Sequence, residues 1–417
     1  MKKILISFVL ALAVFSLAAC NGSDDEVDLN VSQGVTEDSI LVGNAAGTSG
    51  QFAEVGVPFN SAIQSYFDMV NEQGGVAGRT IDFIHYDDES DAELGLNYTQ
   101  ELVEEDEVFS IVGHLGTPTV EATRDYLVSV GVPRVYYATG VSSLFNPNAE
   151  GGERTSFPVQ PIYDAEGEVM VARIFDEFDG EEIGVIYTDD DAGTGIFDGI
   201  EKRAEELDIT LNTREVGYSD VDMSSAAREL SNSDADAIIV AANQAPAKIA
   251  IQDLHTEGNT KPVVTSYVNA DASFLADIPD IVQDEPFDLY ASAWVDINDP
   301  DGEMGFSDEY WQFAGQVEEE YGANAYAMAG WIAADVFVQG LERVGEDELT
   351  WQSYMEAMEE DPINNPFGGI VDFSDGNRVG TQAMSWLQGT AVQDEDEEWT
   401  YDWATVRDIQ DISEILN

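Results

Sequence analysis

Two short loops of small and hydroxylic residues are the parts of the chain best suited to hold a ligand. Gly116–Thr119 reads Gly-Thr-Pro-Thr, and Ala138–Ser143 reads Ala-Thr-Gly-Val-Ser-Ser. Hydroxyl groups both donate and accept hydrogen bonds, and glycine lets the backbone approach a bound group closely. We expect Thr117 to cap a helix that begins with the following proline, which leaves the amides of Thr119 and Val120 free for an anion. Ordinary turns between strands and helices use the same residue types, so the spacing alone leaves both interpretations open.

Each loop follows a short run of β-branched and aromatic residues, and a segment with helical spacing lies between them. Phe109–Val112 and Pro133–Tyr137 predict strands, and Val120–Val130 predicts a helix. A strand, a helix and a second strand in a compact domain indicate parallel strands with a right-handed crossover. Open parallel sheets bind ligands at the carboxyl ends of their strands. We therefore expect the two loops to face one ligand.

Strands and helices alternate along most of the remaining chain. Before the loops, Ser39–Gly43 and Thr80–Tyr86 predict strands on either side of a helix at Val55–Asn71. After them, the prolines of Phe157–Pro161 suit an extended segment that crosses to a second set of elements. That set is expected to contain helices Ala165–Phe178, Gly195–Glu206, Met223–Asn232 and Pro246–Glu257, and strands Glu182–Tyr187, Leu211–Gly217, Ala237–Ala242 and Pro262–Ser266. The pattern predicts an α/β protein with two Rossmann-like lobes and a ligand cleft between them.

The charge balance is strongly acidic. Asp and Glu number 83 against 16 Lys and Arg, for a net charge of −67. Such a surface repels nucleic acids and anionic lipid headgroups, which excludes a nucleic-acid-binding role. The acidic residues are spread along the whole chain, so we expect an outer surface adapted to high salt or to alkaline surroundings.

The N-terminus has the layout of a secretory signal. Lys2 and Lys3 precede an apolar run, Ile4–Leu17, that is too short for a comfortable membrane span. Leu17–Cys20 reads Leu-Ala-Ala-Cys and resembles the lipobox of bacterial lipoproteins, in which the cysteine is acylated. We therefore expect residues 1–19 to be a signal peptide, Cys20 to carry lipid, and residues 20–37 to be an acidic tether. Cys20 is the only cysteine, so the folded part has no disulfide.

Two sequence motifs resemble a known family. Gly113–Thr119 reads GHLGTPT and Val132–Gly140 reads VPRVYYATG; in this order and separation they are similar to the type I periplasmic binding proteins. Among these, the chain most resembles the leucine/isoleucine/valine-binding receptors of ABC transporters, from about Ser39 to the C-terminus. The resemblance implies a monomer that binds one small ligand without a cofactor, closes by a hinge, and delivers the ligand to a permease and ATPase complex.

The resemblance also implies how the lobes are divided. The family joins its two lobes by three crossing segments, and we expect the second and third near Leu289–Trp294 and Val371–Asn377. Lobe 1 would then contain residues 38–158 and 290–374, and lobe 2 residues 159–289 and 375–417. The only membrane contact would be made by the lipid, on the outer face of the cytoplasmic membrane or in the periplasm.

The ligand-binding residues that the resemblance implies, together with strand-end positions, form one set. It contains Ser49, Leu115, Gly116, Thr117, Ala138, Thr139, Gly140, Asp191, Asn243, Tyr267 and Tyr326.

The sequence departs from the amino-acid-specific relatives at the site positions expected in the second lobe. Those relatives hold the ligand's ammonium with a glutamate near the position of Tyr267, and they have an aromatic residue where this chain has Ala192. Because burying an unpaired ammonium is costly, two alternatives follow. Asp189, Asp191 or Asp271 supplies the missing charge, or the ligand is a carboxylate or an amide without an ammonium group.

No pattern in the chain indicates catalysis. The histidines His85, His114 and His255 are scattered, and the motifs of phosphate-binding, dinucleotide-binding and serine-nucleophile sites are missing. The acidic run Asp87–Asp91 lacks the ligand alternation of a calcium loop, so we expect a solvated turn and no metal site. The sequence therefore favours a transport receptor over an enzyme. A sensory protein that presents a small molecule to a signalling partner is the alternative that it leaves open.

Overall fold

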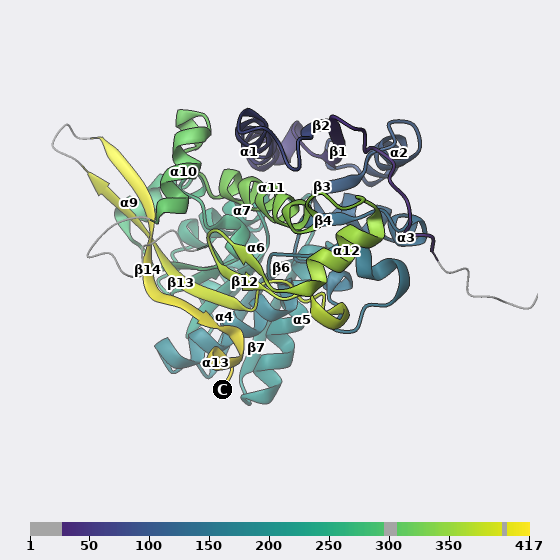
Figure 1. Cartoon of the computed structure of the whole chain (residues 1–417). Helices are drawn as coiled ribbons and strands as arrows, with labels where there is room; N and C mark the ends of the chain where they lie inside the picture. The colour runs from purple at the N-terminus through teal and green to yellow at the C-terminus, as the bar shows by residue number, and fades with distance from the viewer. Residues whose placement is uncertain (1–26, 296–306, 394–397) are drawn as a thin grey trace, which may run out of the picture.

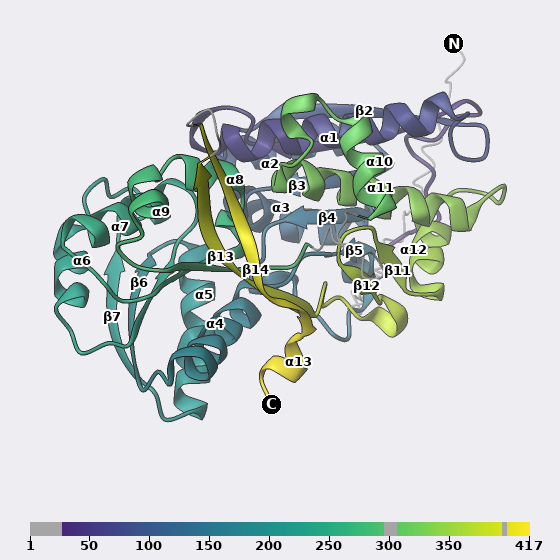
Figure 2. The ribbon, with the colours of Figure 1, turned by 90° about the vertical axis from the view of Figure 1, so that its left-hand side faces the viewer.

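The chain forms two α/β lobes, each built on its own sheet (Figure 1). The computed structural model describes residues 27–295, 307–393 and 398–417. The first sheet has the strand order β2-β1-β3-β4-β5, and all its pairings are parallel. The second has the order β14-β13-β10-β9-β8-β6-β7, with β13 and β14 antiparallel to their neighbours and the other strands parallel. In Figure 2 the second lobe, with β6 and β7, stands beside the first, with β3 and β4.

The first lobe takes its elements from two parts of the chain. The first part comprises β1 (Ser39–Ala46), α1 (Ala53–Glu72), β2 (Thr80–Asp87), α2 (Ala92–Glu104), β3 (Ser110–Leu115), α3 (Thr117–Val130), β4 (Arg134–Ala138) and β5 (Ser156–Phe157). The second part comprises α10 (Asp308–Gln316), α11 (Ala325–Val344), α12 (Trp351–Glu360), β11 (Ile363–Asn365) and β12 (Gly369–Val371).

The second lobe is built in the same way. Its main run comprises α4 (Tyr163–Phe178), β6 (Glu182–Thr188), α5 (Asp191–Glu206), β7 (Thr210–Val216), α6 (Ser224–Ser231), β8 (Ala237–Ala241), α7 (Ala245–Thr256), β9 (Val263–Thr265), α8 (Ala272–Ala276), α9 (Pro279–Asp284) and β10 (Leu289–Ala293). It is completed by β13 (Ala383–Gln393), β14 (Trp399–Asp411) and α13 (Ile412–Ile415).

The strands β3 and β8 show no alternation of buried and exposed residues, because helices cover both faces of their sheets. Every residue of β3 and of β8 is buried. Within the first lobe, α11 is mostly buried and packs against α1, where Tyr66 donates a 2.6 Å hydrogen bond to Asp335 and its ring meets that of Trp331 edge-on. All strands and helices expected between residues 39 and 266 are present, with their ends displaced by a few residues.

Much of the two segments in which we expected the second and third crossings stays with a single lobe. Leu289–Ala293 is the strand β10, paired with β9 and β13 inside the second sheet, so the expected boundary at 289/290 falls within a strand. The segment after β12 stays with the first lobe as far as Arg378, whose backbone pairs with that of Asn146. The chain then passes beside the first crossing, where the amide of Thr381 donates to the carbonyl of Val159 at 2.6 Å.

Residues 27–37, expected in a tether, pack against the first lobe instead. Leu29 and Val31 lie on the core, and their carbonyls accept hydrogen bonds from the amides at the start of α12. The side chain of Gln33 donates to two carbonyls at the end of α2 and in the loop before β3. The expectation from composition was wrong for this part because two spaced apolar side chains suffice to hold a polar segment on a surface. The expected signal peptide and Cys20 lie outside the described residues.

None of the helices in the described parts of the chain is long and apolar enough to cross a bilayer.

Candidate functional site

A cavity of about 200 Å³ lies between the two lobes, at the carboxyl ends of both sheets. From the first lobe, Leu115 and Ala138 line it at the last positions of β3 and β4. From the second lobe, Asp190, Asn243 and Tyr267 each follow a strand end by two residues and line it from the other side. The position agrees with the general rule for ligand sites in parallel sheets.

Aromatic side chains make up much of the cavity wall. Tyr163 and Tyr267 stack with their ring centroids 5.9 Å apart. Tyr136 stands between Phe59 and Trp294, at centroid distances of 5.8 and 6.3 Å. These rings supply large rigid apolar surfaces, which suit the hydrocarbon part of a small molecule.

Thr117 lines the cavity, but it does not cap its helix as expected. Gly116, at φ 99°, is the residue before α3, and Thr117 is its first residue. The Thr117 hydroxyl instead shares a 2.7 Å hydrogen bond with the hydroxyl of Thr139 on the neighbouring loop. The amide of Val120 donates to the carbonyl of Gly116 at 3.0 Å, so it is not free for an anion. The hydroxyl of Thr117 therefore lies at the polar end of the site, and Thr139, which is not among the residues that line the cavity, is its hydrogen-bond partner.

Tyr163 and Asn243 continue this polar cluster from the second lobe. Burial raises the pKa of Tyr163, while hydrogen bonds with Thr139 and Thr117 and with the backbone of Gly140 lower it. The Asn243 amide group donates to the Tyr163 hydroxyl at 3.3 Å, and its oxygen is buried without a partner among the described residues. Because a buried polar atom is normally satisfied, the Asn243 side chain keeps one hydrogen-bonding atom for a ligand.

Tyr267 is held from several sides and carries no charge to the cavity. Its hydroxyl donates to the carbonyl of Pro161 at 2.9 Å and accepts from Gln160 at 3.2 Å. Gly140 gives it room, because a Cβ at position 140 would lie 2.4 Å from the Tyr267 hydroxyl oxygen. Gly140 was expected to let a ligand approach the backbone closely. In the structure it does not line the cavity, and the group that approaches it closely is the Tyr267 hydroxyl.

A buried carboxyl lies directly behind Tyr267. Glu166 on α4 is fully buried and accepts hydrogen bonds from the amide of Tyr267 and the hydroxyl of Ser266. Burial raises the pKa of Glu166 to about 8, although these two hydrogen bonds lower it. Glu166 does not line the cavity. Its hydrogen bonds hold the loop that contains Ser266 and Tyr267, and it makes no contact with the cavity itself.

The four aspartates near the second lobe's strand ends are placed differently. Asp191 is exposed and lies off the cavity wall, so its assignment to the site was wrong; Asp190 lines the cavity in its place. Asp190 accepts hydrogen bonds from the Thr188 hydroxyl at 2.6 Å and from the Gly193 amide at 3.1 Å, and burial raises its pKa. Asp189 binds the amide of Tyr218, and Asp271 binds amides at Ser273 and Ala325.

Ser49 does not line the cavity either. Burial would raise the pKa of the neighbouring Asp87, but hydrogen bonds from the Ser49 hydroxyl and from nearby amides lower it overall. Phe52, three residues further on, occupies the wall instead. The acidic run from Asp87 is only partly solvated, because Asp88 is buried and accepts a 2.5 Å hydrogen bond from Thr119. In the described residues no group of three or more His, Cys, Asp and Glu is placed to hold a metal ion.

Tyr326 lines the cavity from the start of α11 and contacts the opposite lobe. Its hydroxyl donates to the carbonyl of Val268 at 3.1 Å and accepts from the Gln244 side chain at 2.8 Å. Beside it, the amide of Ala325 donates to Asp271 at 2.8 Å. An ion pair between Lys248 and Glu54 at 3.2 Å adds a further link between the lobes. The two lobes are therefore in contact around the cavity.

The crossing segments contribute wall residues that the sequence did not indicate. Gln160 and Tyr163 come from the first crossing and the helix that follows it, and Trp294 comes directly after β10. Because crossing segments pass between the lobes, their polar and aromatic residues are natural cleft residues. The proline-rich run at 157–161 was the available signal.

Comparison with known proteins places this fold. The sequence pattern of a family described as periplasmic binding protein matches residues 39–394. The leucine-specific-binding protein of Salmonella typhimurium is 26% identical over 177 residues, which are 41% of this chain and 45% of that protein. The match to this curated relative therefore spans less than half of its length.

Two solved structures cover nearly the whole chain. A fatty acid ABC transporter substrate-binding protein from Thermomonospora curvata has a TM-score of 0.77 at 22% identity, over 92% of this chain and 95% of that one. A branched-chain amino acid ABC transporter protein from Thermus thermophilus, with bound valine, has a TM-score of 0.77 at 14% identity, over 92% and 98% of the two chains. These likenesses establish the fold, and the family match extends over most of the chain: the protein belongs to the periplasmic binding protein family.

Proposed function

We propose that the protein is an extracytoplasmic solute-binding lipoprotein of an ABC importer, and that it binds one small carboxylate or amide between its lobes. The observation that carries this proposal is the interlobe cavity, with aromatic walls and a cluster of hydroxyl and amide groups at the ends of the strands. Family membership supports a binding role, and the Thermomonospora and Thermus proteins are both described as parts of ABC transporters.

The polar groups of the cavity favour a ligand with an oxygen-bearing head. The Thr117 hydroxyl, which is bonded to that of Thr139, would donate to the oxygen of a carboxylate or a carboxamide. The unpartnered oxygen of Asn243 would accept a hydrogen bond from the N–H of a carboxamide, whereas a carboxylate has no hydrogen for it. The aromatic walls would enclose an aliphatic chain or a ring.

The distribution of charge favours a ligand without an ammonium group. Asp190 is the only carboxylate that lines the cavity among the described residues, and it is already bound to Thr188 and Gly193. The neutral Tyr267 offers no counter-charge for an ammonium. The relatives differ on this point, since one is described as a fatty acid receptor and others as receptors for valine or leucine.

Binding would be coupled to closure of the two lobes. Contacts such as Tyr326 with Gln244 require the lobes to approach, so a ligand that touches both lobes stabilises the closed arrangement. Closure also removes water from the polar cluster, which strengthens its hydrogen bonds to the ligand. A permease that recognises the closed form would then receive only loaded protein.

Matched pairs of ligands test the proposal. Calorimetry would compare leucine with 4-methylpentanoic acid and with its amide, which keep the carbon skeleton and lack the amino group. A second pair, phenylalanine and 3-phenylpropanoic acid, does the same for an aromatic body. We expect the acids or amides to bind at least about tenfold more tightly than the amino acids, given the cost of an unpaired buried ammonium.

The variant Asp190→Asn is the control for residual charge at the cavity. If leucine binds tightly and Asp190→Asn abolishes that binding, the ligand is an amino acid and the charge argument is wrong. If no acid, amide or amino acid binds, the proposed ligand class is wrong. The importer role is tested separately, by ligand uptake into vesicles that contain a candidate permease and ATPase from the same organism, with and without this protein.

A further inference from the structure

A second, small cavity gathers three arginines in a chain that has few basic residues. It has a volume of about 20 Å³ and lies beside β4, next to the loop that follows it. Arg124, Arg134 and Arg378 line it, although the whole chain contains only 16 Lys and Arg. Clustering of like charges is unfavourable unless each charge has an acceptor or an opposite charge beside it. The partners of each arginine therefore decide what the cavity can hold.

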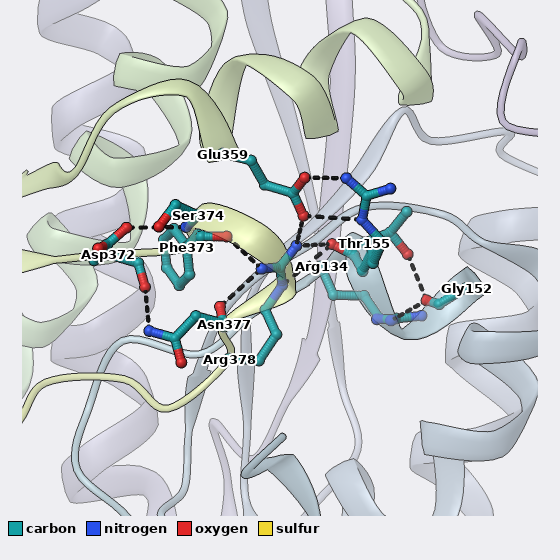
Figure 3. A network of polar contacts seen from close by, with 10 residues as sticks. Arg134, Gly152, Thr155, Glu359, Asp372, Phe373, Ser374, Asn377 and Arg378 are labelled. Atoms are coloured by element: carbon teal, nitrogen blue, oxygen red, sulfur yellow. Dashed lines mark hydrogen bonds and ion pairs between the residues drawn. The ribbon is translucent and has the colours of Figure 1, made fainter. Parts of the chain in front are cut away.

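Two of the arginines are fully engaged. Figure 3 shows Arg378 between the helix that carries Glu359 and the loop that carries Gly152 and Thr155. Arg378 forms an ion pair with Glu359 and donates to the carbonyls of Arg154, Phe373 and Asn377. Arg124 pairs with Asp125 and Glu153. The carboxylate of Glu153, which also lines the cavity, is held by Arg124 and Asn146 and does not reach a further donor among the described residues.

Arg134 is not fully engaged. Arg134 is 2% exposed as a whole residue, and its Nη2 donates to the carbonyl of Gly152 at 2.9 Å. Its Nη1 is buried and has no acceptor in the described part of the chain. A buried charged donor without a partner is strongly unfavourable, so an acceptor from outside the protein is expected at this atom.

The surroundings favour an anion over a neutral acceptor. Arg124, Arg154 and Arg378 form ion pairs with three carboxylates, those of Asp125, Glu153 and Glu359, and Arg134 takes part in none of these pairs. Burial lowers the pKa of Arg378, and the charges of Arg154 and Arg134 lower it further, against the effect of Glu359. A negative ion would relieve this excess of positive charge, whereas a water molecule would not.

We propose that this cavity binds a single halide ion, chloride under ordinary conditions, held by Nη1 of Arg134 and by the hydroxyl pair of Tyr137 and Ser156. These two hydroxyls also line the cavity and lie 3.0 Å apart. Their mutual bond uses one of their two hydrogens, so the other is free for an anion. A volume near 20 Å³ accommodates one particle of about the size of water, which suits a monatomic ion better than a carboxylate or a sulfate.

The site lies where the third crossing leaves the first lobe. The backbones of Arg378 and Asn146 exchange hydrogen bonds of 2.9 and 2.8 Å there, and Arg134 belongs to β4 of the first sheet. A halide held by Arg134, Tyr137 and Ser156 would join β4 and β5 beside that crossing. Bound halide therefore stabilises the folded protein by mass action.

Bromide and anomalous scattering give the direct test. Crystals of the unaltered protein grown in sodium bromide should show an anomalous peak at hydrogen-bonding distance from Arg134 Nη1. A water molecule at that position, with no anomalous signal, overturns the proposal. This measurement needs no variant and is independent of the ligand in the interlobe cavity.

Thermal unfolding gives the second test. At equal sodium concentration, the unfolding temperature should be higher in chloride than in gluconate, an anion too large for the cavity, and the difference should saturate. In Arg134→Gln the chloride concentration that gives half of the maximal rise in unfolding temperature should increase roughly 10- to 100-fold. This is the change in affinity expected for the loss of one hydrogen bond to a charged group. Arg228→Gln, which removes an exposed arginine paired with Glu257, should keep the response. Equal stability in the two salts, or an unchanged response in Arg134→Gln, counts against the halide site.

Discussion

Tyr326 of the first lobe and Gln244 of the second share a hydrogen bond of 2.8 Å across the edge of the interlobe cavity. Gln244 adopts φ 55°, a left-handed conformation that is unfavourable for a residue with a side chain. The backbone N–H of Gln244 donates to the side-chain oxygen of Asn269 at 2.7 Å, and the Gln244 side chain is directed at Tyr326. Strained residues persist where the surroundings over-determine them, and this one makes a contact that exists only when the lobes are together.

Removal of the Tyr326 hydroxyl is therefore expected to weaken ligand binding through closure. In Tyr326→Phe the ring remains on the cavity wall, but the bonds to Gln244 and Val268 are lost. Affinity should fall roughly 2- to 10-fold, the range for one or two neutral hydrogen bonds. Calorimetry with the best ligand measures this, and Tyr187→Phe, which loses an exposed bond to Glu215 away from the cavity, is the matched control. Equal affinities for the two variants would show that the Tyr326 contact does not support closure.

The Thr117 hydroxyl is expected to contribute directly to ligand affinity. Thr117→Val keeps the shape of the side chain but removes the partner of Thr139 and a donor for the ligand's oxygen. A hydrogen bond to a charged group contributes on the order of 1.5–3 kcal/mol, so affinity for a carboxylate should fall roughly 10- to 100-fold. Thr256→Val, at an exposed helix end, should leave affinity unchanged. Unaltered binding by Thr117→Val would remove the hydroxyl pair from the proposed site.

Glu166 is expected to make stability depend on pH. Burial raises its pKa from an ordinary 4.5 to about 8 in the folded protein. Between these values the folded protein keeps the proton and the unfolded chain loses it, so the contribution of Glu166 falls as pH rises from about 4.5 to about 8. Outside this window its contribution is constant.

Glu166→Gln isolates this contribution from that of the many other carboxylates. The glutamine can still accept from the amide of Tyr267 and can donate to the hydroxyl of Ser266. The unfolding temperature of the variant, relative to the unaltered protein, should rise steadily between about pH 5 and about pH 8. A difference that is constant over this range would mean that Glu166 is charged in the folded protein.

The net charge of −67 is expected to make the protein less stable at low ionic strength. Sodium ions screen the repulsion between carboxylates, so the unfolding temperature should rise by at least about 5 °C between about 0.05 and about 2 M sodium gluconate. Gluconate is chosen because this general effect requires only the cation, unlike the halide effect at Arg134. A flat response would show that the carboxylates are too far apart or too well paired to repel one another.

Cys20 is expected to anchor the protein to the membrane. The Leu-Ala-Ala-Cys sequence at residues 17–20 is the basis for this prediction. In Cys20→Ala the protein should move from the membrane fraction to the soluble fraction of cells, since no acyl chain can be attached. Retention of that variant in the membrane fraction would argue against lipidation.

The sequence by itself determined the alternation of strands and helices, the division into two lobes, and the loops that meet at the cleft. Local periodicity and turn chemistry define these features, which is why Phe109–Val112 and Val120–Val130 were found close to their observed places. The position of a strand end also fixes which loop faces the cleft, and Thr117, Asn243 and Tyr267, which follow strand ends, line the cavity; their role in ligand binding stays a prediction.

Only the tertiary structure decided which atoms of these loops face the ligand. Whether Asp190 or Asp191 points inward depends on a single residue at the start of α5, and a helix turns by a large angle per residue. The partners of Thr117, Tyr267 and Arg134 are 22, 106 and 18 residues away in the chain. Contacts at such separations follow from how the lobes and crossings pack, and a local pattern carries no record of them.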